Sequence, residues 1–201
     1  MNSIIWNDDF DSGHFATEDP RVFVLLDREP YATMPDGCGY PPIVGIDYGY
    51  GSFDVEVIDP CWRGGCSCDG GRKGEAWARA IKHFGRNDAN VERFARIFLG
   101  AERVETVSCT VGQGGSYYLV AVRDESDTGF LEAWQAYLDG EVYSVSIAVL
   151  RDRLTHDDPA DLDEAEIVET VGGFYGARWA ALVGEEMARY MDLPEFLPMS
   201  V

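Results

Sequence analysis

Basic side chains are what this sequence has least of. Among 201 residues, 16 are Lys or Arg and 36 are Asp or Glu, so that the formal net charge at pH 7 is −20. Lysine occurs only as Lys73 and Lys82. Duplex DNA and anionic membranes are negatively charged and are repelled by such a chain as a whole. We therefore expect no direct binding of nucleic acid and no attachment to a membrane.

Long apolar runs are missing as well. No run approaches the roughly 20 residues of a membrane-spanning helix. The segment Met1–Asp9 carries charge where a secretion signal is apolar, so we expect a cytoplasmic protein. The five cysteines then face a reducing environment, in which disulfides are rare. Apolar residues still make up 46% of the chain, which is enough for a folded core.

Familiar catalytic motifs are absent. The sequence contains neither the G-x-S-x-G pattern of a serine nucleophile nor the HExxH pattern of a zinc protease. His14, His83 and His156 are scattered, and nothing local supports pairing one of them with Cys109 or Ser116. The missing motifs favour a non-enzymatic protein, with an enzyme of acidic, salt-adapted surface as an alternative.

Four of the cysteines fall in a region rich in Gly, Pro and Tyr, residues 37–72. These are Cys38, Cys61, Cys66 and Cys68. Four thiolates can hold zinc tetrahedrally, and the ion would brace a loop that buries little apolar surface. Their spacing is not that of a standard zinc knuckle, so four reduced thiols are the competing interpretation. A zinc-braced protein-interaction module is accordingly a second alternative function.

The stretch 104–150 predicts an antiparallel meander. Apolar and polar residues alternate in Val104–Val111, glycines follow, and an apolar run rich in Tyr and Val comes next. Asp139-Gly140 between two apolar runs is a strong hairpin signal, because a type I′ turn needs positive φ at both central positions. Four strands are therefore expected: Val104–Val111, Ser116–Arg123, Trp134–Leu138 and Glu141–Leu150.

Helices are expected on both sides of this meander. Trp77, Ile81 and Phe84 recur at helical spacing within Gly74–Phe84. Asn87 or Asp88 can cap a second helix that Gly100 closes. A last amphipathic helix is expected over residues 177–191, after a tight turn at the glycines of residues 172–176.

These elements predict the α+β fold class and a single domain covering residues 1–201. Its core would be a helix–helix–meander–helix unit over residues 73–191, with the helices on one face of the sheet. Residues 1–72 would form an irregular extension rich in Gly, Cys and Tyr. Within that extension, Arg21–Leu26 and Phe53–Ile58 read as short strands.

The charge is unevenly distributed along the chain. Residues 72–103 contain eight bases and four acids, whereas the segments on both sides of them are strongly acidic. The basic helices could bind nucleic acid or an acidic partner, or they could neutralise the acidic ends or be ordinary solvated faces, which is the interpretation we adopt. The acids that could form an anionic surface are Asp157, Asp158, Asp161, Asp163, Glu164, Glu166 and Glu169 in one strip, and Asp8, Asp9 and Asp11 in another.

One short stretch carries a resemblance. The sequence Val-Gly-Gly-Phe-Tyr-Gly at residues 171–176, followed by an amphipathic helix, resembles the tail of small uncharacterised acidic proteins of actinobacterial phages and plasmids. The resemblance implies a mobile-element setting, in which anti-defence proteins are common. Antirestriction proteins that mimic DNA are similar in size and acidity, but their acidic motif is not found here.

Together these features predict a non-enzymatic acidic binding protein of phage or mobile-element origin. Carboxylates spaced like phosphates can occupy the groove of a DNA-binding protein, so we expect a DNA mimic that blocks a host DNA-binding or defence protein. Its partner would be a basic, nucleic-acid-binding host protein. A homodimer would extend the anionic surface, although nothing in the sequence demands one. Solubility is the competing explanation of the charge.

Overall fold

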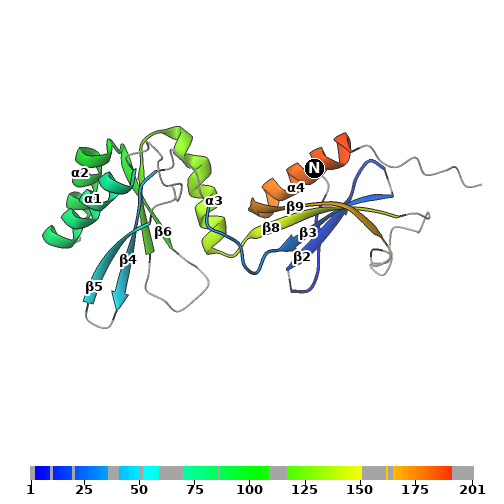
Figure 1. Cartoon of the computed structure of the whole chain (residues 1–201), viewed down its shortest axis with the longest axis horizontal. Coiled ribbons are helices and arrows are strands. Elements are labelled where there is room, and N and C mark those ends of the chain that lie inside the picture. Colours follow the sequence, from blue (N-terminus) through cyan, green and yellow to red (C-terminus); the bar gives the residue numbers. More distant parts are fainter. Residues whose placement is uncertain are drawn as a thin grey trace, which may run out of the picture. The chain divides into compact units, whose positions relative to one another are not determined.

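The computed structural model describes residues 3–9, 11–19, 21–35, 41–49, 52–58, 70–85, 87–108, 117–150, 162 and 165–191. Strands and helices of these residues confirm the α+β class (Figure 1). The strands are β1 (Ile5–Trp6), β2 (Ser12–Ala16), β3 (Val22–Arg28), β4 (Ile43–Gly49), β5 (Ser52–Ile58), β6 (Arg103–Ser108), β7 (Tyr117–Val122), β8 (Val142–Val149) and β9 (Glu166–Tyr175). The helices are α1 (Gly70–Phe84), α2 (Asp88–Leu99), the short 3₁₀ helix η1 (Glu125–Asp127), α3 (Thr128–Leu138) and α4 (Ala177–Tyr190).

Two compact units make up the chain. Unit 1 consists of Met1–Ala32 and Glu141–Val201, and unit 2 consists of Thr33–Gly140. Strands β3 and β8 are antiparallel neighbours in unit 1, so unit 2 occupies the place of the loop that joins them. Each unit has its own sheet and core. That the whole chain acts as a single domain stays a prediction.

Unit 1 is a five-stranded antiparallel sheet with the order β1-β2-β3-β8-β9 (Figure 1). Helix α4 covers one face of β3 and β8, where Val24, Leu26, Val145 and Ile147 are fully buried. Buried alanines and Gly184 on α4 allow this close contact, since a large side chain at these positions would separate helix and sheet.

The opposite face of the same sheet is also buried in its centre. Phe23, Ala148 and Leu150 form a second small cluster there. Leu162 and Ala165 pack against this cluster, and both precede β9 in the chain. Part of the connection from β8 to β9 therefore lies on the face away from α4.

Unit 2 is a four-stranded antiparallel sheet with the order β5-β4-β7-β6. Helices α1 and α2 cover the face that contains Val44 and Leu119. Helix α3 covers the other face, where Ile43 and Val120 lie. Neighbouring residues of one strand point to opposite faces, so the continuous apolar runs of β4 and β7 follow from burial on both sides.

Several predicted elements are confirmed. Helix α2 begins after Asn87, whose side-chain oxygen accepts the N–H of Ala89 at 3.0 Å, and it ends at Gly100 in the left-handed conformation. Helices α1 and α4 and strands β3 and β5 lie where the sequence predicts them. Strands β6 and β7 also pair as an antiparallel hairpin, with Val107 opposite Tyr118.

The expected strand over Trp134–Leu138 is wrong, because these residues belong to helix α3. Phe130, Trp134 and Leu138 recur every four residues and pack on the sheet of unit 2. Gly140 has a φ of 71° and lies just after the helix. Positive φ serves a helix C-terminus as well as a hairpin turn, so the Asp-Gly signal did not distinguish the two.

The four-stranded meander and the irregular N-terminal extension are wrong for a related reason. Strand β8 lies in the sheet of unit 1 between β3 and β9, whereas β6 and β7 lie in unit 2. The expected extension contains strands β1 to β5. Of these, β1, β2 and β3 belong to the sheet of unit 1, and β4 and β5 belong to the sheet of unit 2. The helices of residues 74–100 and 177–191 consequently cover two different sheets, and in unit 2 helices cover both faces.

The expected tight turn over residues 172–176 is replaced by a β-bulge within β9. Tyr143 is opposite Phe174 and Val145 is opposite Val171, so two glycines face the single residue Ser144. Gly173 has a φ of 84°, which is the conformation that a glycine supplies at such a bulge. The strand then continues to Tyr175 before α4 begins.

Candidate functional site

The excess of acidic residues is concentrated in unit 1. Its two segments contain 20 acidic and six basic residues, for a net charge of −14. Unit 2 contains 16 acidic and ten basic residues, for a net charge of −6, although it is the longer of the two. Electrostatic attraction of a basic partner is therefore expected to be strongest at unit 1.

The structure describes half of the ten acids predicted to form the anionic surface. Glu166 and Glu169 lie on β9, and Asp8, Asp9 and Asp11 lie in or beside the turn between β1 and β2. All five are exposed. The other predicted acids lie outside the described residues, namely Asp157, Asp158, Asp161, Asp163 and Glu164.

The two groups of described acids lie at opposite edges of the unit 1 sheet. Strand β9 forms one edge and β1 the other, with β2, β3 and β8 between them. That these acids form two anionic strips stays a prediction.

Strand β9 places its acids on a defined face. Glu169 is opposite Ile147 and Glu166 is opposite Val149, and both of these β8 residues belong to the core under α4. Directly opposed residues of antiparallel strands point to the same face. The two carboxylates therefore project on the α4 side of the sheet edge.

The turn between β1 and β2 is fixed by Asn7. Its side-chain oxygen accepts the N–H of Asp11 at 3.0 Å and that of Ser12 at 3.3 Å, which is the local bonding that favours Asn in turns. Asp8 and Asp9 are exposed within this turn. Asp11 forms an ion pair with Arg28 at 3.4 Å, which neutralises part of the charge at this edge.

Arg28 links this turn to the core beside Tyr143. Burial raises the pKa of Tyr143, and the hydrogen bond and charge of Arg28 act in the opposite direction. The Tyr143 ring lies 5.7 Å from that of Trp6. We interpret the contact between the neutral tyrosine and the ion-paired arginine as one that stabilises the fold, since neither group is a nucleophile at neutral pH.

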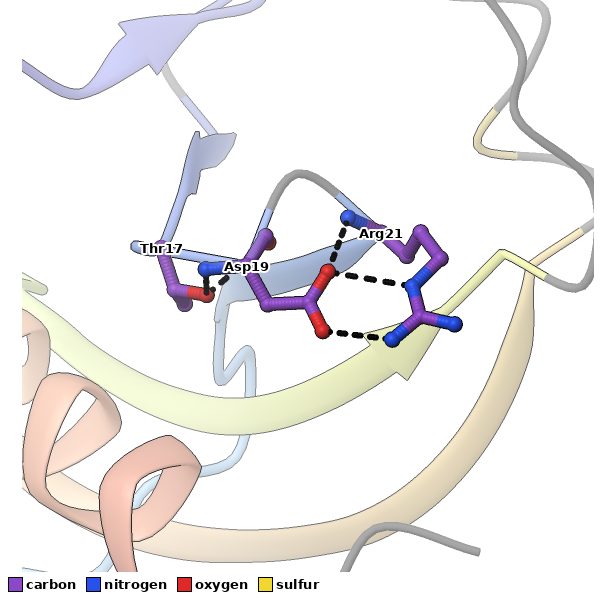
Figure 2. Close-up of polar contacts among 3 residues, drawn as sticks. All are labelled: Thr17, Asp19 and Arg21. Atoms are coloured by element: carbon purple, nitrogen blue, oxygen red, sulfur yellow. Dashed lines mark hydrogen bonds and ion pairs between the residues drawn. The ribbon is translucent and has the colours of Figure 1, made fainter. Parts of the chain in front are cut away.

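Another acid, Asp19, is held at the turn between β2 and β3 (Figure 2). Its carboxylate accepts two hydrogen bonds from the Arg21 guanidinium, at 3.1 and 2.7 Å, and one from the Arg21 backbone N–H at 3.0 Å. The side-chain hydrogen bond from Arg21 is the main cause that lowers the pKa of Asp19, with smaller contributions from the backbone bond and the charge. Thr17 Oγ1 accepts the N–H of Asp19 at 3.2 Å.

The described structure does not bring the candidate catalytic residues together in one site. His14 lies on β2, where burial lowers its pKa, and His83 lies on α1 in edge-to-face contact with Phe84. They belong to different units. His156, Cys109 and Ser116 lie outside the described residues.

Zinc binding stays a prediction. Cys38, Cys61, Cys66 and Cys68 all lie outside the described residues. Within the described part of the chain, no three His, Cys, Asp or Glu side chains are grouped as metal ligands would be.

Comparison with known proteins gives no indication of function. No protein-family model, curated protein or solved structure matches the chain. Among the helices of the described residues, none has the length and apolar character needed to cross a membrane. Functional argument therefore rests on the chain's own surfaces.

The basic segment of unit 2 forms the exposed side of α1 and α2. Phe84 stacks on Phe94 with ring centroids 5.3 Å apart, and Phe94 stacks on Phe98 at 6.0 Å. An open hollow of about 320 Å³ lies beside this aromatic row and is lined by Arg72, Lys73, Ala76 and Phe98. Arg79 pairs with Glu75 on the same helix, a contact that contributes little at this exposure.

Sequence reasoning missed strand β9. It treated residues 155–169 as an acidic strip and predicted a tight turn at the glycines of residues 172–176. Ile167, Val168, Thr170 and Val171 are β-branched, which is the signal that could have identified a strand there. As a result, the exposed edge that these residues form in unit 1 was not foreseen.

Proposed function

We propose that this chain is a non-enzymatic binding protein whose acidic unit 1 occupies the nucleic-acid-binding surface of a basic partner, as a mimic of DNA. The observation that carries the proposal is the concentration of negative charge in unit 1, which has a net charge of −14. A DNA-binding groove attracts such a surface by the same long-range steering that brings it to duplex DNA. The partner class we favour is a host defence or DNA-binding protein, in keeping with a mobile-element setting.

Exposed carboxylates at both sheet edges support this proposal. Glu166 and Glu169 at one edge, and Asp8 and Asp9 at the other, are exposed to solvent. The partner's cations would replace the counterions of these groups, so complex formation should weaken steeply as salt increases.

The test is affinity capture with the full chain from a lysate of the cells that carry its gene. Capture at about 50 mM and about 500 mM salt, followed by elution with duplex DNA, distinguishes binding at the DNA-binding surface of a partner from non-specific electrostatic binding. Mimicry predicts a DNA-binding protein that is retained at low salt and released by added duplex DNA. A partner that added DNA does not displace would contradict mimicry.

Charge reversal provides the matched control. Lysine at Asp8, Asp9, Glu166 and Glu169 should abolish capture. The same number of reversals at exposed acids of unit 2, namely Glu92, Glu102, Glu125 and Glu132, should reduce it far less. Equal losses from the two sets would mean that only total charge matters, and the assignment to unit 1 would be wrong.

A further inference from the structure

We propose that the β9 edge of unit 1 binds an extended segment of the partner as a sixth strand, and that this segment alternates basic and apolar residues. The inference rests on the proposed function, because it specifies how a basic partner engages unit 1. Two observations carry it: the exposed main chain of an edge strand and the distribution of side chains on that strand's two faces.

Among the described strands, β9 is a long edge that pairs on one side only. It runs for 10 residues, pairs with β8 on one side, and lies at the end of the sheet order. Its first eight residues are exposed, and the last two are partly exposed. An edge strand directs N–H and C=O groups away from its neighbour, and these groups are the template for adding another strand.

Apolar side chains on this edge are unusually open to solvent. Ile167 is 54% exposed, Val168 is 42% exposed and Val171 is 40% exposed. Trp179 on α4, the helix that follows β9, is 59% exposed. The buried core of an interface is more apolar than the rest of a protein surface, and tryptophan is enriched there, so this edge has features of a binding surface.

The two faces of β9 differ, and the difference specifies the partner. On the α4 face lie Glu166 and Glu169, each opposite a β8 residue of the α4 core. On the other face lies Ile167, which is opposite Ala148 of the second cluster. Over residues 166–169 an incoming strand therefore meets carboxylates on the α4 face and an aliphatic side chain on the other face. Further along, Val171 is opposite Val145 and adds an apolar side chain to the α4 face. Because side chains alternate along a strand, the complementary sequence alternates basic and apolar residues.

A second copy of this chain is the less suitable occupant. Pairing two β9 strands would bring the glutamates of both copies together, and each chain has a net charge of −20. Like charges on directly opposed strands destabilise the pair. A basic strand gains attraction where a second copy meets repulsion.

The test uses the full chain and synthetic peptides of the same length as β9, 10 residues. The probe alternates Lys and Val, and its control has the same composition in one block of Lys and one block of Val. A third peptide keeps the alternating sequence but carries N-methyl groups on alternate amides, which removes main-chain donors and keeps the charge. We expect the alternating peptide to bind at least about tenfold more tightly than either control. Only this peptide can form main-chain hydrogen bonds with β9 and at the same time place Lys and Val on the matching faces of the strand.

Variants of the chain locate the site. Ile167→Lys should weaken binding of the alternating peptide by about tenfold or more, since it replaces apolar contact by repulsion. Ile5→Lys is the matched control: Ile5 is 60% exposed and lies on β1, the opposite edge of the same sheet, so binding should change little. Equal losses from these two variants would overturn the assignment to β9.

The outcomes separate this inference from the proposed function. If the alternating, blocked and N-methylated peptides bind equally and all are released by salt, strand addition is wrong and electrostatic binding by unit 1 stands. If none binds even at low salt, both proposals fail. A concentration-dependent dimer in which the β9 amides become protected from hydrogen exchange would assign the edge to a second copy and overturn the inference.

Discussion

The carboxylate of Glu29 accepts the backbone N–H of Gly173 at 2.7 Å. Glu29 lies just after β3, and Gly173 lies in the bulge of β9, so the contact spans the intervening strand β8. A β-bulge takes one N–H out of the regular ladder, and here a side chain from the far end of the sequence accepts it. The contact lies where the chain leaves unit 1 for unit 2, and it holds the glycine end of the edge strand in place.

Glu29→Ala should destabilise unit 1 by about 1 kcal/mol, the usual cost of losing one hydrogen bond that is partly exposed to solvent. Hydrogen exchange at the Gly173 amide should accelerate at the same time. Gly172→Ala tests the contact from the other side, because its Cβ would overlap with the Glu29 carboxylate oxygen. If the overlap causes the damage, Gly172→Ala should cost less in the Glu29→Ala background, and additive effects in urea unfolding would contradict this.

Gly184→Ala should destabilise unit 1 by about 1 to 3 kcal/mol through overpacking. A Cβ at this position would overlap with Cγ1 of Val24 and lie 3.1 Å from Cγ1 of Val145, and both valines are fully buried. Gly129→Ala in α3 is the control, because nothing lies within 4 Å of its Cβ. There the better helix propensity of alanine should stabilise unit 2 by up to about 1 kcal/mol. Unfolding curves with the same sign for both variants would contradict the close helix–sheet contact.

Asp127→Ala should be among the most damaging changes in unit 2, at about 2 to 4 kcal/mol. Asp127 is 3% exposed, and its carboxylate accepts the Arg123 backbone N–H at 2.8 Å, Nε at 3.1 Å and Nη2 at 2.7 Å. The hydrogen bond to Asp127 raises the pKa of Arg123, so the arginine stays charged and loses its partner in the variant. The Arg123 side chain is 35% exposed, so the loss of stability in the variant should be smaller than for a fully buried ion pair. Asp124→Ala, which removes only the bonds to Ser126, should cost less in chemical denaturation.

The Asp19–Arg21 pair predicts a pH dependence of stability. The pKa of Asp19 is lowered from its ordinary value of 3.8, mainly by the side-chain hydrogen bond from Arg21. A lowered pKa in the folded state gives stability that is present above the unfolded value and lost as pH falls through the folded value. Wild type should therefore exceed Asp19→Asn by up to about 1 kcal/mol at pH 7, given the exposure of the pair, and the difference should shrink below about pH 4. A difference that persists at low pH would contradict the assignment to ionisation, and Arg21→Gln should show the same loss without adding to it.

Sequence patterns located most helices because their signals are local. Asn87 and Gly100 satisfy the free ends of α2 within the segment itself, and the spacing of Trp77 and Ile81 marks the buried side of α1. The charge of unit 1 was likewise visible in the composition. Phe84 shows the limit of such patterns, since it shares that spacing and is 60% exposed.

Pairing partners were not determined by local pattern. Alternation in β8 indicates which residues share a face, but not which strand lies beside it, and its neighbour β3 comes from before the whole of unit 2. The Asp-Gly pair was compatible with a hairpin and with a helix end, and packing of Phe130 and Trp134 on the sheet of unit 2 selected the helix.

The sequence by itself determined the acidity, the capped helices and the absence of catalytic motifs, because each depends on residues close together in the chain. Tertiary structure decided that unit 2 is inserted between β3 and β8, and that β9 is the edge. It also decided that Glu166 and Glu169 share a face of that edge while Ile167 lies on the other. The physical reason is that hydrogen-bonded pairing joins strands regardless of their separation in sequence, and the face on which a side chain projects follows from the residue opposite it.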